Sequence, residues 1–175
     1  VDPVEWETCD EFAADTTVEC GTVTVPLNYG DPDGETVDIA LLRYPAQSSK
    51  PKGVLLVNDG GPGSSGVDFA YNSGPAMIDS LGLEDFDIVG FDPRGVDRSG
   101  GLKCQDDDDT DRFMYMDYTP DNDEEQALYD EWYEAEDPCV ATYGEDLRHY
   151  STENIARDMD QILRGLAYDA FDYGI

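Results

Sequence analysis

The chain has 175 residues, of which 39% are hydrophobic, and this is enough to bury a core of its own. It carries 41 acidic and 10 basic residues, so its formal net charge of −31 argues against a nucleic-acid partner. No apolar run approaches the ~20 residues that cross a bilayer, which predicts a protein without a membrane span. Because the first residue is Val1, we expect the chain to begin after a removed leader or at an artificial boundary.

The N-terminal quarter predicts a strand hairpin. Residues 22–27 alternate in hydropathy as a half-buried strand does, and residues 36–44 form a second strand candidate. The residues between them, 28–34, are dense in turn formers. We therefore predict a hairpin over residues 21–45.

Buried strands and helices alternate in the following residues. The short apolar runs 53–57 and 86–91 are typical of buried parallel strands. Helix-like patterns cover residues 67–81 and about 152–165, and residues 170–175 begin a further strand. This alternation predicts an α/β fold with a mostly parallel sheet flanked by helices.

Residues 105–147 form an acidic segment that holds 17 acidic side chains and one basic one, Arg112. The run Asp106–Asp109 could be read as a metal site. Consecutive like charges repel, however, and a hard cation needs ligands spaced around a turn that contains a glycine. We therefore predict a solvated loop at this run and no metal.

The four cysteines fall into two sequential pairs, Cys9 with Cys20 and Cys104 with Cys139. Zinc is poorly supported because the sequence has neither a Cys-x-x-Cys motif nor a Cys/His cluster. Of the three possible connectivities, we choose the two sequential pairs because each closes a local loop. Two disulfides imply an oxidising compartment, secreted or in the cell envelope.

The sharpest feature is the glycine loop, residues 58–66 (NDGGPGSSG), which follows the strand predicted at 53–57. Glycines let a backbone N–H face a ligand without a Cβ in the way. A phosphate-binding loop is disfavoured because no lysine follows the glycines. The uses that remain are an oxyanion hole, as on the loop after the third strand of an α/β-hydrolase, and a purely structural turn.

Two motifs carry a resemblance to a known family. Residues 55–66 (LLVNDGGPGSSG) resemble the oxyanion loop of the prolyl-aminopeptidase and tripeptidyl-aminopeptidase-like branch of the α/β-hydrolases, His-Gly-Gly-Pro-Gly or Asn-Pro-Gly-Gly-Pro-Gly. Residues 86–99 (FDIVGFDPRGVDRS) resemble its second signature, a strand followed by Asp-x-Arg-Gly-x-Gly-x-Ser. Two residues depart from these patterns: Asp59 replaces His or Pro, and Asp97 replaces the second glycine of the second signature.

Both ends of the chain extend the resemblance. Trp6, Cys9, Cys20 and the segment Val-Pro-Leu-Asn-Tyr are similar to the start of the secreted tripeptidyl-aminopeptidase-like members. Residues 150–160 are similar to the helix before their nucleophile. The resemblance implies that residues 1–175 are the N-terminal part of an α/β-hydrolase catalytic domain.

The resemblance also implies that the chain stops just before the nucleophile elbow. In this branch the preceding strand ends Tyr-x-Gly-x-Ser-x-Gly, and this chain ends Tyr173-Gly174-Ile175, so the serine is expected immediately after Ile175. The sequence contains no Gly-x-Ser-x-Gly, and the acid and the base follow the serine in α/β-hydrolases. We therefore expect no triad residue in this chain and interpret the lone His149 as structural.

Within the chain, the resemblance implies half of an oxyanion hole. Gly60, with Gly61 as its neighbour, is expected to donate a backbone N–H to the tetrahedral intermediate. The second donor is expected from the residue after the serine. Asp92 and Arg94 are expected to brace the loop beneath the site by hydrogen bonds.

The function implied is that of a secreted serine aminopeptidase that releases short N-terminal peptides or residues through an acyl-enzyme, without a cofactor. One alternative is a carboxylesterase or lactonase of the same fold, and another is a non-catalytic binding protein that kept the fold. The expected partners are a peptide or ester substrate and the polypeptide that carries Ser, Asp and His. That polypeptide is either the remainder of the same one or a second chain.

Overall fold

The computed structural model describes residues 2–115, 119–134 and 137–166. The chain divides into two compact units, one formed by residues 1–101 with 149–175 and the other by residues 102–148. The strand predicted at 170–175 lies outside the described residues.

The first unit begins with the predicted hairpin. β1 (Glu19–Pro26) pairs antiparallel with β2 (Thr36–Tyr44), with Val23 opposite Ile39 and Val25 opposite Val37. Valines on β1 are buried while the threonines between them are exposed, as the alternating pattern predicts.

A strand–helix–strand segment follows the hairpin. β3 (Gly53–Val57) and β4 (Phe86–Phe91) are parallel neighbours, and α1 (Gly66–Leu81) connects them. β4 also pairs antiparallel with β2, which gives the strand order β1-β2-β4-β3. The described part of the sheet is therefore mixed, and β3 with β4 is its parallel pair.

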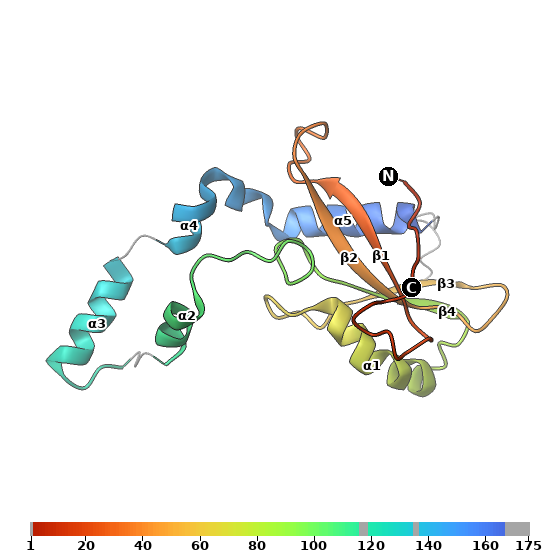
Figure 1. Ribbon diagram of the computed structural model, residues 1–175, viewed down its shortest axis with the longest axis horizontal. Helices are drawn as coiled ribbons and strands as arrows, with labels where there is room; N and C mark the ends of the chain where they lie inside the picture. The colour runs from red at the N-terminus through yellow and green to blue at the C-terminus, as the bar shows by residue number, and fades with distance from the viewer. Residues whose placement is uncertain (1, 116–118, 135–136, 167–175) are drawn as a thin grey trace. The chain divides into compact units, whose positions relative to one another are not determined.

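Helices cover both faces of this sheet (Figure 1). α5 (Thr152–Gly165) buries Ile162 and Leu163 against one face. The strands contribute these buried side chains to that face: Val23, Val25, Ile39, Leu41, Val54, Val89 and Phe91. α1 packs on the opposite face with Leu42, Tyr44, Val57 and Ile88. β2 and β4 are thus buried on both sides, which explains their nearly continuous apolar sequences.

The start of α1 lies unusually close to β4. A Cβ added to Gly66 would be 2.1 Å from the Phe91 carbonyl oxygen, and one added to Gly90 would be 2.2 Å from the Gly66 carbonyl oxygen. Only glycine at both positions allows this approach. It brings the end of the glycine loop to the residue that follows β4.

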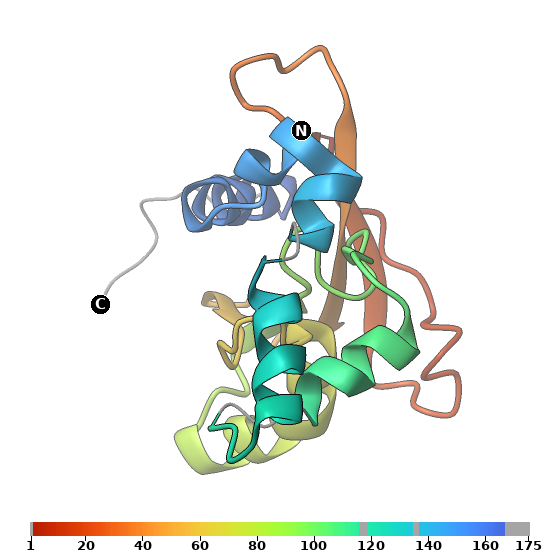
Figure 2. The ribbon, with the colours of Figure 1, turned by 90° about the vertical axis from the view of Figure 1, so that its left-hand side faces the viewer.

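The second unit contains α2 (Asp107–Met114), α3 (Asp123–Glu134) and α4 (Pro138–Tyr143), coloured green to light blue in Figure 2. A 3-10 helix, η1 (Gly144–His149), leads out of it. The loop predicted for the aspartate run is wrong: the Asp106 side chain accepts the Asp109 N–H, and the next three aspartates form the first turn of α2. Acidic residues stabilise a helix at its N-terminus, and this interaction outweighs their mutual repulsion.

The structure confirms the predicted disulfides, Cys9–Cys20 in the first unit and Cys104–Cys139 in the second. Within the described ranges, no helix is long and apolar enough to span a membrane.

Candidate active site at the carboxyl ends of β3 and β4

Two loops leave the sheet at the same edge because β3 and β4 run parallel. The glycine loop follows β3, and the residues from Asp92 to Gly101 follow β4. Sites of α/β proteins lie at the carboxyl ends of such strands. The two loops therefore define the candidate site, and their contacts decide its geometry.

The glycine loop has a backbone that other residues would adopt only under strain. Gly60, Gly61 and Gly63 have φ angles of 86°, 124° and 91°, all in the left-handed region. A Cβ on Gly61 would also lie 2.8 Å from the Gly63 nitrogen, whereas Cβ atoms on Gly60 and Gly63 would meet nothing within 4 Å. The backbone at Gly60 and Gly63 thus borders open space, as a ligand-facing loop must.

One predicted oxyanion donor already has an acceptor in this structure. The Gly60 N–H donates to Asn58 Oδ1 at 2.8 Å, which closes a small turn at the start of the loop. The hydrogen bonds found among the described residues include none from the Gly61 N–H. Asn58 was not singled out by the sequence, although an Asn two residues before a glycine is a recognised turn pattern.

The other end of the glycine loop is held by Ser65 and Asp92. Ser65 precedes α1 and caps it, because its Oγ accepts the Asp68 N–H at 3.0 Å. The same hydroxyl donates to Asp92 Oδ1 at 2.6 Å, and the Val67 N–H donates to that oxygen at 3.1 Å. Asp92 is fully buried, so it supports the loop from beneath the sheet edge.

Arg94 belongs to a different network. Its guanidinium donates to Asp158 on α5 through Nε at 2.7 Å and Nη2 at 2.5 Å. It also donates to the carbonyl oxygens of Pro26, Leu27 and His149. Arg94 therefore joins the end of β1 to α5, rather than the glycine loop to β4.

His149 contributes its main chain to this network. Its carbonyl oxygen accepts from Arg94 Nη1 at 2.9 Å and from Asn154 Nδ2 at 3.0 Å, and the residue is buried. Tyr29 completes the cluster, with its hydroxyl donating to Asp158 Oδ1 at 2.7 Å. Burial, together with this hydrogen bond, raises the pKa of Tyr29.

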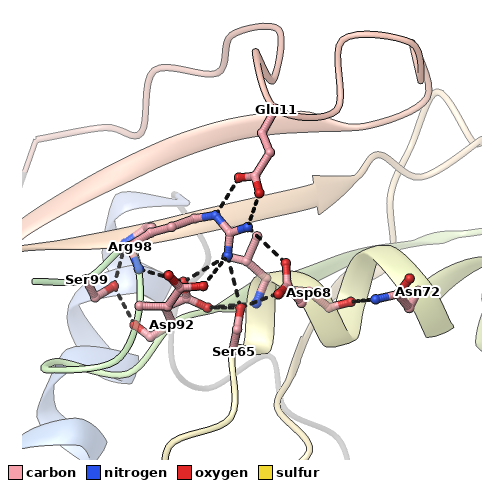
Figure 3. Close-up of polar contacts among 10 residues, drawn as sticks. Glu11, Ser65, Asp68, Asn72, Asp92, Arg98 and Ser99 are labelled. Carbon is pink, nitrogen blue, oxygen red and sulfur yellow. Dashed lines mark hydrogen bonds and ion pairs between the residues drawn. The ribbon is translucent and has the colours of Figure 1, made fainter. Parts of the chain in front are cut away.

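Arg98 is a site residue that no motif of the sequence indicated. Its guanidinium contacts Ser65 in the glycine loop, Asp92 after β4, and Asp68 in the first turn of α1 (Figure 3). It also binds Glu11 through Nε and Nη2, at 2.8 and 2.7 Å. The sequence does contain one hint. The chain has only 10 basic residues, so few cations are available to pair with a buried carboxylate.

The loop also matches a dinucleotide-binding pattern that the missing lysine does not exclude. Residues 61–66 read Gly-Pro-Gly-Ser-Ser-Gly, which fits Gly-x-Gly-x-x-Gly between a strand and a helix. A pyrophosphate would need the first N–H groups of that helix. Here the Val67 N–H donates to Asp92 and the Asp68 N–H to Ser65, so the pattern does not serve a phosphate.

Ser65, at the end of the glycine loop, is not arranged as a nucleophile. Ser65 Oγ donates its one proton to the Asp92 carboxylate, whereas a nucleophilic serine is hydrogen-bonded to the base that takes its proton in the reaction. Among the described residues, no group of three or more His, Cys, Asp or Glu side chains could hold a metal ion.

The mixed sheet between two helices, with a left-handed glycine loop after β3, defines an α/β protein of hydrolase type. A family model described as the alpha/beta hydrolase fold matches residues 53–173, and the chain belongs to that family. The region matched contains both loops of the candidate site.

Curated relatives show which hydrolases this chain is similar to. The chain is 40% identical to Carboxylesterase B of Mycobacterium tuberculosis over 167 residues, covering 90% of this chain and 31% of that protein. It is 35% identical to Serine protease Hip1 of the same species over 183 residues, covering 98% of this chain and 34% of that protein. It is 33% identical to Tripeptidyl aminopeptidase of Streptomyces lividans over 178 residues, covering 97% of this chain and 33% of that protein. The chain thus spans about a third of the length of these relatives.

Proposed function

We propose that this chain is the N-terminal part of a secreted serine aminopeptidase that works through an acyl-enzyme. The observation that carries the proposal is the glycine loop, which has three left-handed glycines at the carboxyl end of β3 and borders open space at Gly60 and Gly63. The catalytic serine, expected immediately after Ile175, attacks the substrate carbonyl with its acid and base supplied from beyond this chain. The glycine loop donates to the oxygen that becomes negative.

Gly61 is the leading donor of the loop, with Gly60 beside it. The Gly60 N–H is hydrogen-bonded to Asn58, so it must leave that acceptor or share its proton to reach the substrate oxygen. Among the described residues, no acceptor is found for the Gly61 N–H. Its φ of 124° and its lack of a Cβ are requirements of this backbone, because a Cβ there would meet the Gly63 nitrogen.

An oxidising compartment accords with the two disulfides, each of which closes a local loop. Relatives named as a serine protease and as a tripeptidyl aminopeptidase support a peptide substrate. A carboxylesterase is the second candidate, because the 40% identical relative carries that name. Both reactions use the same acyl-enzyme chemistry, and they differ in the leaving group and in recognition of the amine.

The complete polypeptide separates these functions with three substrates. A tripeptide p-nitroanilide with a free N-terminus should be hydrolysed at least tenfold more efficiently, as kcat/KM, than its N-acetylated form. A p-nitrophenyl ester of a short acid serves as the third substrate. Equal rates on the free and acetylated amides would contradict an aminopeptidase, and turnover of the ester alone would favour the carboxylesterase. No turnover of any of the three would favour a non-catalytic protein.

A further inference from the structure

Arg98 occupies a variable position of the second signature, one residue before its final serine, yet it contacts both loops of the candidate site (Figure 3). We propose that Arg98 is a positioning residue for the glycine loop, acting through Ser65 and Asp92. This inference rests on the proposed function, because it concerns the geometry of the oxyanion donors.

Ser65 is the hub of this arrangement because its hydroxyl is fully used. A hydroxyl has one proton to donate and two lone pairs to accept with. Ser65 Oγ donates to Asp92, and it accepts from the Asp68 N–H at 3.0 Å and from Arg98 Nη1 at 3.2 Å. Since Ser65 is the last residue before α1, these three bonds fix the end of the glycine loop in one orientation.

Asp92 needs a cation close by because its side chain is wholly buried, with an exposed fraction of 0%. A buried carboxylate that loses its counter-charge destabilises the structure around it. Arg98 supplies that charge, with Nη1 at 3.4 Å from Asp92 Oδ2, and its backbone N–H donates to the same oxygen at 3.2 Å. Removing the guanidinium should therefore displace Asp92 and, through it, Ser65.

Arg98 is itself held by acidic groups on three sides. Glu11, from the loop closed by Cys9–Cys20, forms a bidentate ion pair with it. Asp68 contacts Nη2 at 2.9 Å, and Asp97 contacts Nη1 at 3.0 Å. Burial opposes the charge, but these carboxylates outweigh it and raise the pKa of Arg98 above its usual value. The guanidinium is therefore a fixed positive charge next to the loop.

The test compares Arg98→Met with Arg164→Met in the complete polypeptide. Arg164 is the matched control, because it is an exposed arginine in an i,i+4 pair with Asp160. Rates are normalised to active sites counted by a phosphonate burst, so that unfolded protein does not contribute. We expect Arg98→Met to lower kcat by about 10- to 100-fold, the range that a displacement near 1 Å can produce. KM should change less than threefold, affinity for a peptide boronate should fall in parallel with kcat, and Arg164→Met should match the wild type.

Two further variants separate positioning from general stability. Arg98→Lys keeps the positive charge but loses the planar guanidinium that can donate to several acceptors at once. It should therefore recover part of the kcat that Arg98→Met loses. The losses of kcat caused by Ser65→Ala and by Arg98→Met should not multiply in the double variant, because the arginine acts through that serine.

Three results would overturn the inference while leaving the proposed function intact: Arg98→Met equal to Arg164→Met, multiplicative losses in the double variant, or a raised KM with unchanged kcat. An inactive wild-type polypeptide would instead remove the proposed function, and the inference with it.

Discussion

At the residue scale, the two loops of the candidate site have left-handed backbone at six positions. Five are glycines, Gly60, Gly61 and Gly63 in the glycine loop and Gly95 and Gly100 after β4, and the sixth is Asp97, with a φ of 37°. The aminopeptidase-like branch that the sequence resembles has glycine at the position of Asp97 in its second signature. The positive φ at this position explains why glycine is favoured there. Aspartate tolerates this region better than most residues do, and the ion pair of Asp97 with Arg98 helps to hold it there.

The residue-scale prediction uses two glycines with nearly the same backbone. Gly60 and Gly63 have φ angles of 86° and 91°, and a Cβ would meet nothing within 4 Å at either. Gly60→Val should lower kcat on the order of 10²-fold, comparable to losing an oxyanion donor, because its side chain enters the space of the scissile carbonyl. Gly63 is not one of the proposed oxyanion donors, so Gly63→Val carries similar strain at a position without that role and should retain far more activity. Equal losses, with equal melting temperatures, would place the substrate elsewhere.

At the element scale, the buried pair of Arg94 and Asp158 ties α5 to the sheet. The exposed fractions of the two side chains are 0% and 1%. Arg94 also donates to the carbonyl oxygens of Pro26, the last residue of β1, and Leu27, so the pair fixes the helix against the end of a strand. Under the proposed function, α5 precedes the segment in which the catalytic serine is expected, so the position of this helix would help to place that serine.

Asp158→Ala and Asp160→Ala test this role on one helix. Loss of Asp158 leaves a buried guanidinium without its carboxylate and should destabilise the protein by about 3–5 kcal/mol. Asp160 is half-exposed and pairs with Arg164 four residues on, so its loss should change stability by about 0.5 kcal/mol or less. Urea unfolding of the two variants gives both values. A similar small change for both would show that the buried pair does not anchor α5.

The same scale shows which elements the sequence could predict. The hairpin and the segment 53–91 follow from patterns with strong physical causes: alternation on β1, continuous apolar runs on β3 and β4, and turn residues between them. α2 could not be predicted by counting like charges, since its aspartates act as an N-terminal turn. In the site, the loop glycines carried a local signal, whereas the pairing of Arg98 with Glu11 spans 87 residues and has none.

At the scale of the whole molecule, the proposed function expects the catalytic triad outside residues 1–175. In the described residues, the Ser65 hydroxyl donates to Asp92, and the carbonyl oxygen of His149 accepts from Arg94. The chain spans about a third of the length of the curated relatives it matches. Under the proposed function, the nucleophile is expected immediately after Ile175, and the glycine loop of the first unit would stabilise the oxyanion.

The position of the nucleophile is tested by labelling the complete, active polypeptide with a fluorophosphonate and mapping the modified serine by peptide mass. We predict one labelled serine, immediately after Ile175, and loss of turnover in proportion to labelling. A label on Ser64 or Ser65, or full inhibition without any labelled serine, would contradict it.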